Sequence, residues 1–220
     1  ARATGALKAG WNGFAVLSAA ASRVGGLDIG LVPGKGGKDA AGMVKAMDVL
    51  ILLGADELDL KPAKDAFVVY LGSHGDAGAH RADVILPGAA YTEKSGTYVN
   101  TEGRVQMTAR AAFAPGEARE DWAVLRALSA TLGRALPFDS LDQLRAGLHA
   151  AHPHMAAIDA IAPGRAEDVA AIASKTGKTG AKPFASAVED FYLTNPIARA
   201  SAVMAECSAL ARGGLKAAAE

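Results

Sequence analysis

The sequence has few of the features that define several common protein classes. It contains one cysteine, Cys207, in 220 residues. Counting therefore excludes both a disulfide framework and an iron–sulfur cluster held by this chain alone, because each needs more thiols. No apolar run is long enough and free enough of charge to cross a bilayer. The first residues show no signal-peptide pattern.

An excess of charge of one sign is also missing. The chain has 23 Lys and Arg against 23 Asp and Glu, so its formal net charge is zero. Nucleic acid and anionic membrane surfaces attract basic proteins, so we expect no nucleic-acid partner and no direct membrane insertion. Half of the residues are hydrophobic, which is enough to form a core. Because the chain starts at Ala1 without Met, we expect it to be a C-terminal piece of a longer polypeptide.

Three short apolar runs determine the predicted fold class. They are Val49–Leu53, Phe67–Leu71 and Ala82–Leu86, and the first two are followed by Gly54 and Gly72. Continuous apolar runs of this length are typical of strands buried on both faces of a parallel sheet. The sequence therefore predicts an α/β fold with an open, mainly parallel sheet flanked by helices.

Apolar spacing and capping residues predict the helices. Apolar residues recur at three- and four-residue intervals from Leu7 to Val24, which predicts a first helix, and Leu27–Val32 follows as a short strand or extended link. Asp39 is a suitable N-cap for a second helix through Met47. Further helices are expected at Asp121–Leu132, after the capping box of Ser140 and Gln143, and around Ala166–Ser174.

These elements predict two parts. Residues 1–135 are expected to form the α/β domain, and residues 136–220 a helical extension with a flexible linker. Phe184–Cys207 is interpreted as a docking tail that lies across the α/β body or a neighbouring subunit. The aromatic residues and Asn-Pro of its DFYLTNP run suit docking, or closure of the domain's own edge.

The stretch from Ala82 to Gln106 contains the clearest local signals. Its strand ends at Pro87, because proline cannot donate to a sheet ladder. The AAYTEK run that follows predicts one or two helical turns, ended by Gly96. The turn Asn100–Gly103 is typical of a hairpin with a type I turn and a glycine bulge.

Three segments carry a resemblance to a known family. They are FVVYLGSHGDAGAHRADVILPGAAYTEKSGTYVNTEGRVQ, GEAREDWAVLRALSATLG and DFYLTNPIARASAVMAEC. The chain resembles the molybdopterin oxidoreductase superfamily and, within it, the large iron–sulfur subunits of respiratory complex I. The likeness covers most of the chain and is weakest between Ala150 and Ala187.

The resemblance implies a function for the whole assembly. Complex I is a proton-pumping NADH:quinone oxidoreductase that passes electrons through FMN and iron–sulfur clusters to quinone. The intact subunit would carry 2Fe-2S and 4Fe-4S clusters, with none in this segment, and molybdopterin is expected to be absent. Its partners would be other peripheral-arm subunits at the inner membrane, on the cytoplasmic side in bacteria or the matrix side in mitochondria.

Two polar loops follow the predicted strands, where ligands bind in open α/β sheets. Gly72–Asp76 contains a serine, a histidine and an aspartate. A hydrolytic triad needs such groups to converge from separate segments, so turn hydrogen bonds are the favoured interpretation. Gly54–Glu57 stands where the superfamily's molybdenum enzymes have a Gly-x-Asn-Pro-like turn. Asp56 and Glu57 would repel a pyrophosphate, and we interpret them as solvated loop residues.

The remaining motifs are interpreted as structural. Gly177–Thr179 and Gly34–Lys38 imitate phosphate-binding loops but lack the required context, so we interpret the first as a flexible linker and the second as a surface loop. His149, His152 and His154 have no acidic or cysteine partner for a zinc site. A structural role is also expected for the charged residues of the central stretch, which are Glu93, Lys94, Glu102 and Arg104. Trp122 is expected in the core.

We therefore expect no catalytic, cofactor-binding or metal-ligating residue in this segment. The functional hypothesis is a structural, assembly-bearing part of the complex I iron–sulfur subunit. Two alternatives remain open. One is a fragment of a true molybdopterin-dependent oxidoreductase of the formate-dehydrogenase type, and the other is a stand-alone interaction module.

Overall fold

The computed structural model describes residues 1, 4–8, 11–18, 20–161, 165–174, 180–183, 185–186 and 188–213. The chain divides into two compact units, and each is discontinuous in sequence. The α/β unit comprises residues 32–96, 109–144 and 188–220, and the hairpin unit comprises residues 1–31, 97–108 and 145–187. The division predicted at residue 135 stays a prediction.

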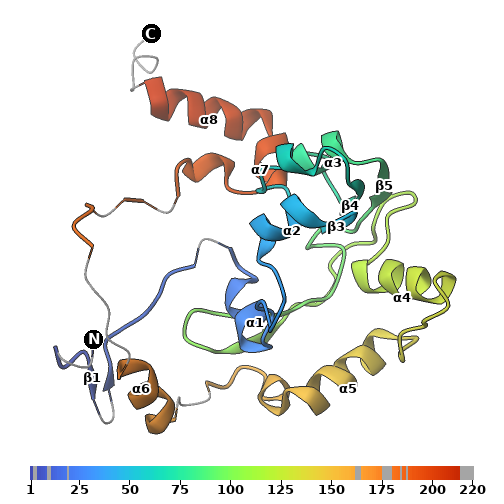
Figure 1. Ribbon diagram of the computed structural model, residues 1–220. Helices are drawn as coiled ribbons and strands as arrows, with labels where there is room; N and C mark the ends of the chain where they lie inside the picture. The colour runs from blue at the N-terminus through green and yellow to red at the C-terminus, as the bar shows by residue number, and fades with distance from the viewer. Residues whose placement is uncertain are drawn as a thin grey trace. The chain divides into compact units, whose positions relative to one another are not determined.

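A three-stranded parallel sheet forms the centre of the α/β unit. Its strands are β3 (Val49–Leu53), β4 (Phe67–Gly72) and β5 (Val84–Pro87), in the order β3-β4-β5. Ile51 pairs with Val69, which pairs with Val84 on its other side. The predicted α/β fold class is confirmed, and all three predicted strands are present (Figure 1).

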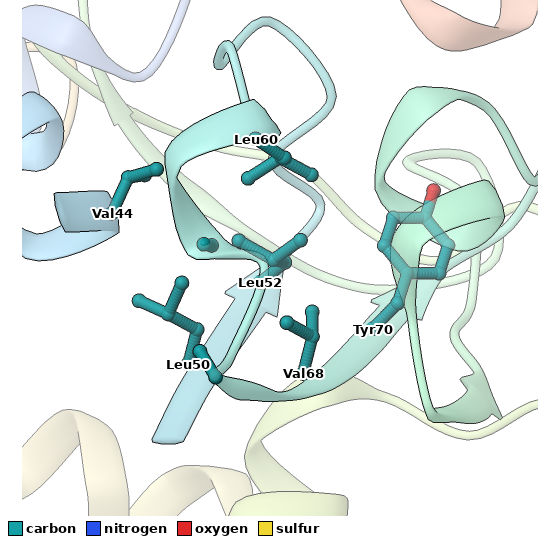
Figure 2. Close-up of a cluster of buried hydrophobic side chains, with 8 residues drawn as sticks. Val44, Leu50, Leu52, Leu60, Val68 and Tyr70 are labelled. Carbon is teal, nitrogen blue, oxygen red and sulfur yellow. The ribbon is translucent and has the colours of Figure 1, made fainter. Parts of the chain in front are cut away.

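The connections between the strands cover one face of this sheet. They contain η1 (Lys61–Ala63) and α3 (Ala77–Arg81), and α2 (Ala40–Ala46) precedes β3. Asp39 caps α2 as predicted, since its side chain accepts a hydrogen bond of 2.8 Å from the N–H of Gly42. The resulting core, shown in Figure 2, contains Val44, Leu50, Leu52, Leu60, Ala63, Ala66, Val68 and Tyr70.

The other face of β3 is exposed. Leu50 and Leu52 are buried, but Val49, Ile51 and Leu53 are 57%, 44% and 47% exposed. The prediction that this strand is buried on both faces is therefore wrong for the described residues. An apolar run shows that both faces are apolar, but it does not show that both are covered by the same 220 residues.

Helices complete the α/β unit. They are α4 (Asp121–Thr131), α7 (Pro196–Ala200) and α8 (Ala202–Gly213), with η3 (Phe191–Leu193) before α7. The helix predicted from Asp121 is confirmed. Trp122 is half-buried, not a core residue, and its ring lies 6.4 Å from that of Phe138.

Helix α5 (Leu141–Ala151) begins at the capping box predicted from the sequence. Ser140 Oγ accepts a hydrogen bond of 3.2 Å from the N–H of Gln143. The Gln143 side chain reaches back one residue further than predicted, because it accepts 2.6 Å from the N–H of Asp139. Both contacts satisfy N–H groups that a helix start leaves free.

The hairpin unit is built on the antiparallel strands β6 (Thr97–Val99) and β7 (Val105–Met107). The predicted turn between them is confirmed. Asn100 Oδ1 accepts from the N–H groups of Glu102 and Arg104, and Gly103 has a φ of +85°. Helix η2 (Pro153–Ala156) adds Met155 to a small core, whose other members are Val24, Val99, Val105, Leu148 and Ile158.

The N-terminal helix prediction is wrong. Strands β1 (Leu7–Lys8) and β2 (Trp11–Asn12) pair antiparallel, and the first helix, α1, spans Arg23–Asp28. Helix α1 includes Leu27 and Asp28, so the short strand or extended link predicted over Leu27–Val32 is wrong for its first two residues; no strand is assigned at residues 29–32. The glycines at 10 and 13 explain the failure, because each one weakens a helix by about 1 kcal/mol relative to alanine.

Two further predictions have mixed outcomes. The AAYTEK run forms turns and no helix, with the N–H of Ala90 donating to the Glu93 side chain at 2.9 Å. Helix α6 (Ala166–Ala173) confirms the prediction made there. Most of the predicted linker lies outside the described residues. None of the helices among the described residues is long and apolar enough to span a membrane.

Candidate functional site

The carboxyl ends of β3 and β4 form the candidate site, because ligands of open α/β sheets bind beyond these ends. The loop after β3 begins at Gly54, with a φ of +59°, and the loop after β4 turns at Gly75, with a φ of +52°. Both glycines adopt a left-handed backbone that other residues rarely tolerate. The two turns direct Asp56, Glu57 and Asp76 into contacts with other parts of the α/β unit.

Asp56 is the buried carboxylate of this site. It is 6% exposed, so the interpretation of this residue as a solvated loop acid is wrong. Its Oδ2 accepts 2.8 Å from the hydroxyl of Tyr70, and its Oδ1 accepts 2.9 Å from the N–H of Gly78. Both oxygens are therefore hydrogen-bonded, as a buried carboxylate requires.

Tyr70 connects the sheet to this carboxylate. Burial of the phenol, its hydrogen bond to Asp56 and the charges of Asp56 and Asp76 raise the pKa of Tyr70 far above its ordinary value. The hydroxyl therefore stays protonated and donates to Asp56. The ring lies so close to two backbone segments that they must be glycine: an added Cβ would lie 2.1 Å from the Tyr70 oxygen at Gly72 and 2.7 Å from the ring at Gly78.

Arg199 holds the other two carboxylates. Its Nη2 lies 2.8 Å from Glu57 Oε1, its Nε donates to Asp76, and its Nη1 donates to the carbonyl of Leu193. Burial alone would lower the pKa of Arg199, but hydrogen bonds to Glu57 and Asp76 outweigh it and raise the pKa. We call Arg199, Glu57 and Asp76 the arginine clamp.

The sequence around Arg199 explains its position. Asn195 caps α7 by accepting 2.9 Å from the N–H of Ala198, and Pro196 occupies the first turn, where its missing N–H costs nothing. The clamp joins the tail to the strand ends across more than 120 residues of sequence. The predicted docking of the tail on the α/β body is confirmed within the α/β unit.

The serine, histidine and aspartate of Gly72–Asp76 do not line up as a triad. Ser73 Oγ lies 2.8 Å from His74 Nδ1, and this pair is exposed. The carboxylate of Asp76 is paired with Arg199 instead. A triad needs the carboxylate to orient the histidine, so the contacts favour the interpretation as loop hydrogen bonds.

The site does not fit an anionic cofactor such as the guanine-dinucleotide pterin of molybdenum enzymes. Phosphate sites offer free N–H groups and cations. Here three carboxylates face one guanidinium, which is already bound to two of them. The N–H of Gly78 is also taken, because Asp56 accepts from it. The chain's own carboxylates thus occupy the donors that a pyrophosphate would need.

The histidine cluster forms no recognisable metal centre in the described part of the chain. The rings of His152 and His154 are 6.1 Å apart. His154 Nε2 lies 2.9 Å from Asp28 Oδ2, so the expectation that these histidines have no acidic partner is wrong for His154. No group of three or more His, Cys, Asp or Glu suited to a metal occurs among the described residues. The expected lack of catalytic, cofactor-binding and metal-ligating residues stays a prediction.

The charged residues of the central stretch make structural contacts. Lys94 pairs with Asp121 within the α/β unit. Arg104 lies 3.7 Å from Glu102 and donates 2.6 Å to the carbonyl of Asp159 in the hairpin unit. Glu102 and Arg104 thus pair on either side of the turn glycine.

The structure describes only one of the two lysine-containing loops. Gly34–Lys38 forms a turn in which the N–H of Gly37 donates 2.9 Å to the carbonyl of Gly34. The surface-loop interpretation is confirmed by its exposure. Gly177–Thr179 lies outside the described residues.

Sequence reasoning missed Tyr70, Gly78 and Arg199. A tyrosine inside an otherwise aliphatic strand, FVVYL, was a usable signal, since a buried phenol needs a hydrogen-bond partner. Arg199 gave no comparable signal, because its partners lie far away in sequence.

The fold and this site define an α/β class: a parallel sheet with polar loops at the carboxyl ends of its strands, where ligands bind in open α/β sheets. Comparison with known proteins identifies the family. The family model for molybdopterin oxidoreductases matches residues 1–131. The chain belongs to the molybdopterin oxidoreductase family.

Relatives give the closer resemblance. A second family model, for the C-terminal part of an NADH-ubiquinone oxidoreductase subunit, matches residues 158–207. The chain is 46% identical over 211 residues to the mitochondrial 78 kDa subunit of NADH-ubiquinone oxidoreductase of Neurospora crassa, covering 93% of this chain and 28% of that protein. It is 45% identical over 203 residues to the 75 kDa subunit of Reclinomonas americana, covering 91% and 29%.

A plant relative agrees. The mitochondrial NADH dehydrogenase [ubiquinone] iron-sulfur protein 1 of Solanum tuberosum is 44% identical over 201 residues, which cover 91% of this chain and 26% of that protein. The resemblance to the large iron–sulfur subunits of complex I is therefore confirmed. The chain spans a little over a quarter of the length of these relatives.

Proposed function

We propose that this chain is a structural, assembly-bearing part of the large iron–sulfur subunit of NADH:quinone oxidoreductase. In this proposal the intact complex transfers electrons from NADH through FMN and iron–sulfur clusters to quinone. The 220 residues contribute a packed α/β scaffold. The relatives named as subunits of NADH-ubiquinone oxidoreductase support the proposal.

One observation supports the structural role most directly. Each carboxylate at the strand ends has a partner within the chain: Asp56 is held by Tyr70 and Gly78, and Glu57 and Asp76 by Arg199. Carboxylates that act as acids or bases in catalysis must instead be available to a substrate. The same side chains here fasten the tail to the sheet.

The proposal extends to cofactors, partners and location. The 2Fe-2S and 4Fe-4S clusters would lie outside this segment, which has a single cysteine, and molybdopterin would be absent. Other peripheral-arm subunits of complex I would be its partners. The location would be the inner membrane, on the cytoplasmic side in bacteria or the matrix side in mitochondria.

A second candidate is a fragment of a true molybdopterin-dependent oxidoreductase. The family match over residues 1–131 favours it. The charge of the site opposes it, since three carboxylates would have to release their internal partners before a pyrophosphate could bind. We therefore place it second.

Co-migration tests the proposal. Native membranes are solubilised gently and separated on a native gel, which is stained for NADH oxidation and analysed by peptide mass mapping. We expect peptides of this chain in the large NADH-active band, together with cysteine-rich peptides. If the chain migrates apart from the NADH-active band, the proposal is contradicted and a stand-alone interaction module is favoured. If the chain migrates in a molybdenum-containing band, the second candidate is favoured.

A further inference from the structure

A cleft between α3 and the connection from β3 to β4 shares no lining residue with the candidate site at the strand ends. Its volume is about 440 Å³, which falls in the range of small-molecule sites. Lys61, Lys64, His80 and Arg81 line it, and Asp59 is the single carboxylate among its described lining residues. We call it the lysine cleft. The chain as a whole has a formal net charge of zero, so the cations are concentrated here.

Arg81 holds the wall of the lysine cleft in place. Its Nη2 donates to the carbonyls of Ala63 at 2.5 Å and Ala66 at 2.8 Å, and its Nη1 lies 3.3 Å from Asp83 Oδ2. Asp83 also accepts 2.8 Å from the N–H of Val68. The guanidinium thus joins α3 to the connection between β3 and β4, and both of its terminal nitrogens are engaged within the chain.

The two lysines of the cleft are much less engaged. Among the described residues, Lys61 makes no ion pair, and Lys64 has one, at 3.8 Å to Asp65. The side chains of that pair are 80% and 87% exposed, so water weakens the attraction and the pair contributes little. Asp59 accepts 3.2 Å from the backbone N–H of Lys61. The His80 ring makes no hydrogen bond within the described part of the chain, so two ammonium groups and an imidazole are available in one cleft.

Available cations around a cleft suit a phosphate group. A phosphate monoester carries about two negative charges near neutral pH and offers strong acceptor oxygens, and lysine binds it as a compact point charge. A cleft lined by cations also concentrates anions from solution. The strand-end site differs, because its guanidinium is already bound to Glu57 and Asp76. Leu58 and Leu60 add apolar lining beside the lysines, which the carbon skeleton of a ligand can contact.

We propose that the lysine cleft binds a phosphorylated small molecule. Lys61 and Lys64 hold the phosphate oxygens with their ammonium groups, and His80 adds a ring N–H. Leu58 and Leu60 contact the carbon skeleton of the ligand. This binding does not depend on the proposed function, because all of these residues belong to the α/β unit of this chain.

Labelling of individual lysines in the purified native assembly tests this binding. An amine-reactive reagent is applied with and without inorganic pyrophosphate, and each lysine is followed by peptide mass spectrometry. Lys35 and Lys38 are the matched control, since they have the same spacing in sequence and are exposed in the Gly34–Lys38 loop outside the cleft. We expect saturating pyrophosphate to slow the labelling of Lys61 and Lys64 by about threefold or more, because bound oxygens shield the ammonium groups. Equal slowing of all four lysines, or no slowing, would overturn the proposal.

Removal of the charges gives a second readout. In Lys61→Gln with Lys64→Gln, equilibrium dialysis should show one fewer bound pyrophosphate per copy of this chain, because each copy has one such cleft. Lys35→Gln with Lys38→Gln should leave binding unchanged, and equal binding by the two variants would contradict the proposal.

Vesicles of phosphatidic acid distinguish the source of the phosphate, because a lipid headgroup offers the same chemistry on a surface. We expect pyrophosphate to slow the labelling of Lys61 and Lys64 in the absence of vesicles. Slowing by vesicles and not by pyrophosphate would show a lipid surface as the ligand and rule out the small molecule.

Discussion

Two surfaces of the same sheet have opposite properties. At the carboxyl ends, where ligand chemistry is usual, Asp56, Glu57 and Asp76 are held by partners from the same chain. On one face of β3, where helices usually pack against a parallel sheet, Val49, Ile51 and Leu53 are exposed. The carboxylates at the strand ends are thus paired within the chain, whereas the apolar side chains on this face of β3 remain exposed among the described residues.

A ligand at the strand ends would compete with the internal hydrogen bonds that hold three carboxylates. Covering the exposed apolar side chains of β3 would contribute free energy at about 25 cal/mol per Å² of buried apolar area. Four changes, from the largest expected effect to the smallest, test the contacts at the strand ends and in the tail.

The largest effect is expected for Gly72→Ala. The added Cβ would lie 2.1 Å from the Tyr70 oxygen, so the ring must move and release Asp56. We expect a loss of about 3 kcal/mol in the free energy of unfolding, measured by denaturant titration. The control is Gly147→Ala in α5, where no atom lies within 4 Å. It should be neutral or stabilise by up to about 1 kcal/mol. Equal losses would contradict the packing of Tyr70.

A smaller effect is expected for Tyr70→Phe. The change leaves Asp56 buried with one hydrogen bond, from the N–H of Gly78, and should lower the free energy of unfolding by about 2 kcal/mol. In an Asp56→Ala background the same change should lose most of its effect. A cost that is the same in both backgrounds would show that the two side chains do not interact.

Arg199→Ala should loosen the tail. The change leaves Glu57 and Asp76 without their cation, and the clamp is only partly buried, so we expect a cost of about 1 kcal/mol. That corresponds to roughly fivefold faster proteolysis within residues 188–213. Arg165→Ala, which breaks an exposed pair with Asp168, is the control and should change nothing measurable. Unchanged cleavage in Arg199→Ala would contradict the clamp.

The smallest effect is a pH dependence of the tail. The hydrogen bond from Ser208, with smaller contributions from Tyr192 and Arg212, lowers the pKa of Asp190 below its ordinary value of 3.8. A lowered carboxyl pKa stabilises the folded tail above pH 3.8, and this contribution is lost as the pH falls from there through the folded-state pKa. The protection of the α8 amides, which is their exchange rate relative to the intrinsic rate at each pH, should therefore fall with acid over this window.

Ser208→Ala gives the matched comparison for this pH dependence. Without the hydroxyl, the pKa of Asp190 should return toward 3.8, so less of the tail's protection should depend on pH in the acid window. An acid dependence as large as in the unchanged chain would show that Ser208 does not set it.

Much of this fold follows from local signals in the sequence. The β3–β5 strands, the Asp39 cap, the Asn100–Gly103 hairpin and α4 depend on neighbouring residues, and the sequence predicts all of them. The first helix fails, because apolar spacing from Leu7 favours a helix that the glycines break. Exposure of β3 could not be predicted either, since the apolar pattern is the same whether or not the covering segment is present.

The site shows the same limit. The acidic loops are recognisable from their places after apolar runs, and their poor match to a phosphate is evident from charge alone. The pairing of these acidic residues within the chain is not evident from the sequence, because Arg199 contacts Asp76 across 123 residues. Pairings at such distance are produced by the whole fold, and a single sequence carries no local pattern for them.

Analysis of the purified native assembly tests the central claim most directly. Molybdenum, iron and guanine nucleotide are measured per copy of this chain in the fraction that oxidises NADH. We expect several irons per copy, and no stoichiometric molybdenum or guanine nucleotide. One molybdenum with guanine nucleotide per copy would contradict it, because the crevice closed by Tyr70, Asp56 and Arg199 would then have to open for an anionic cofactor.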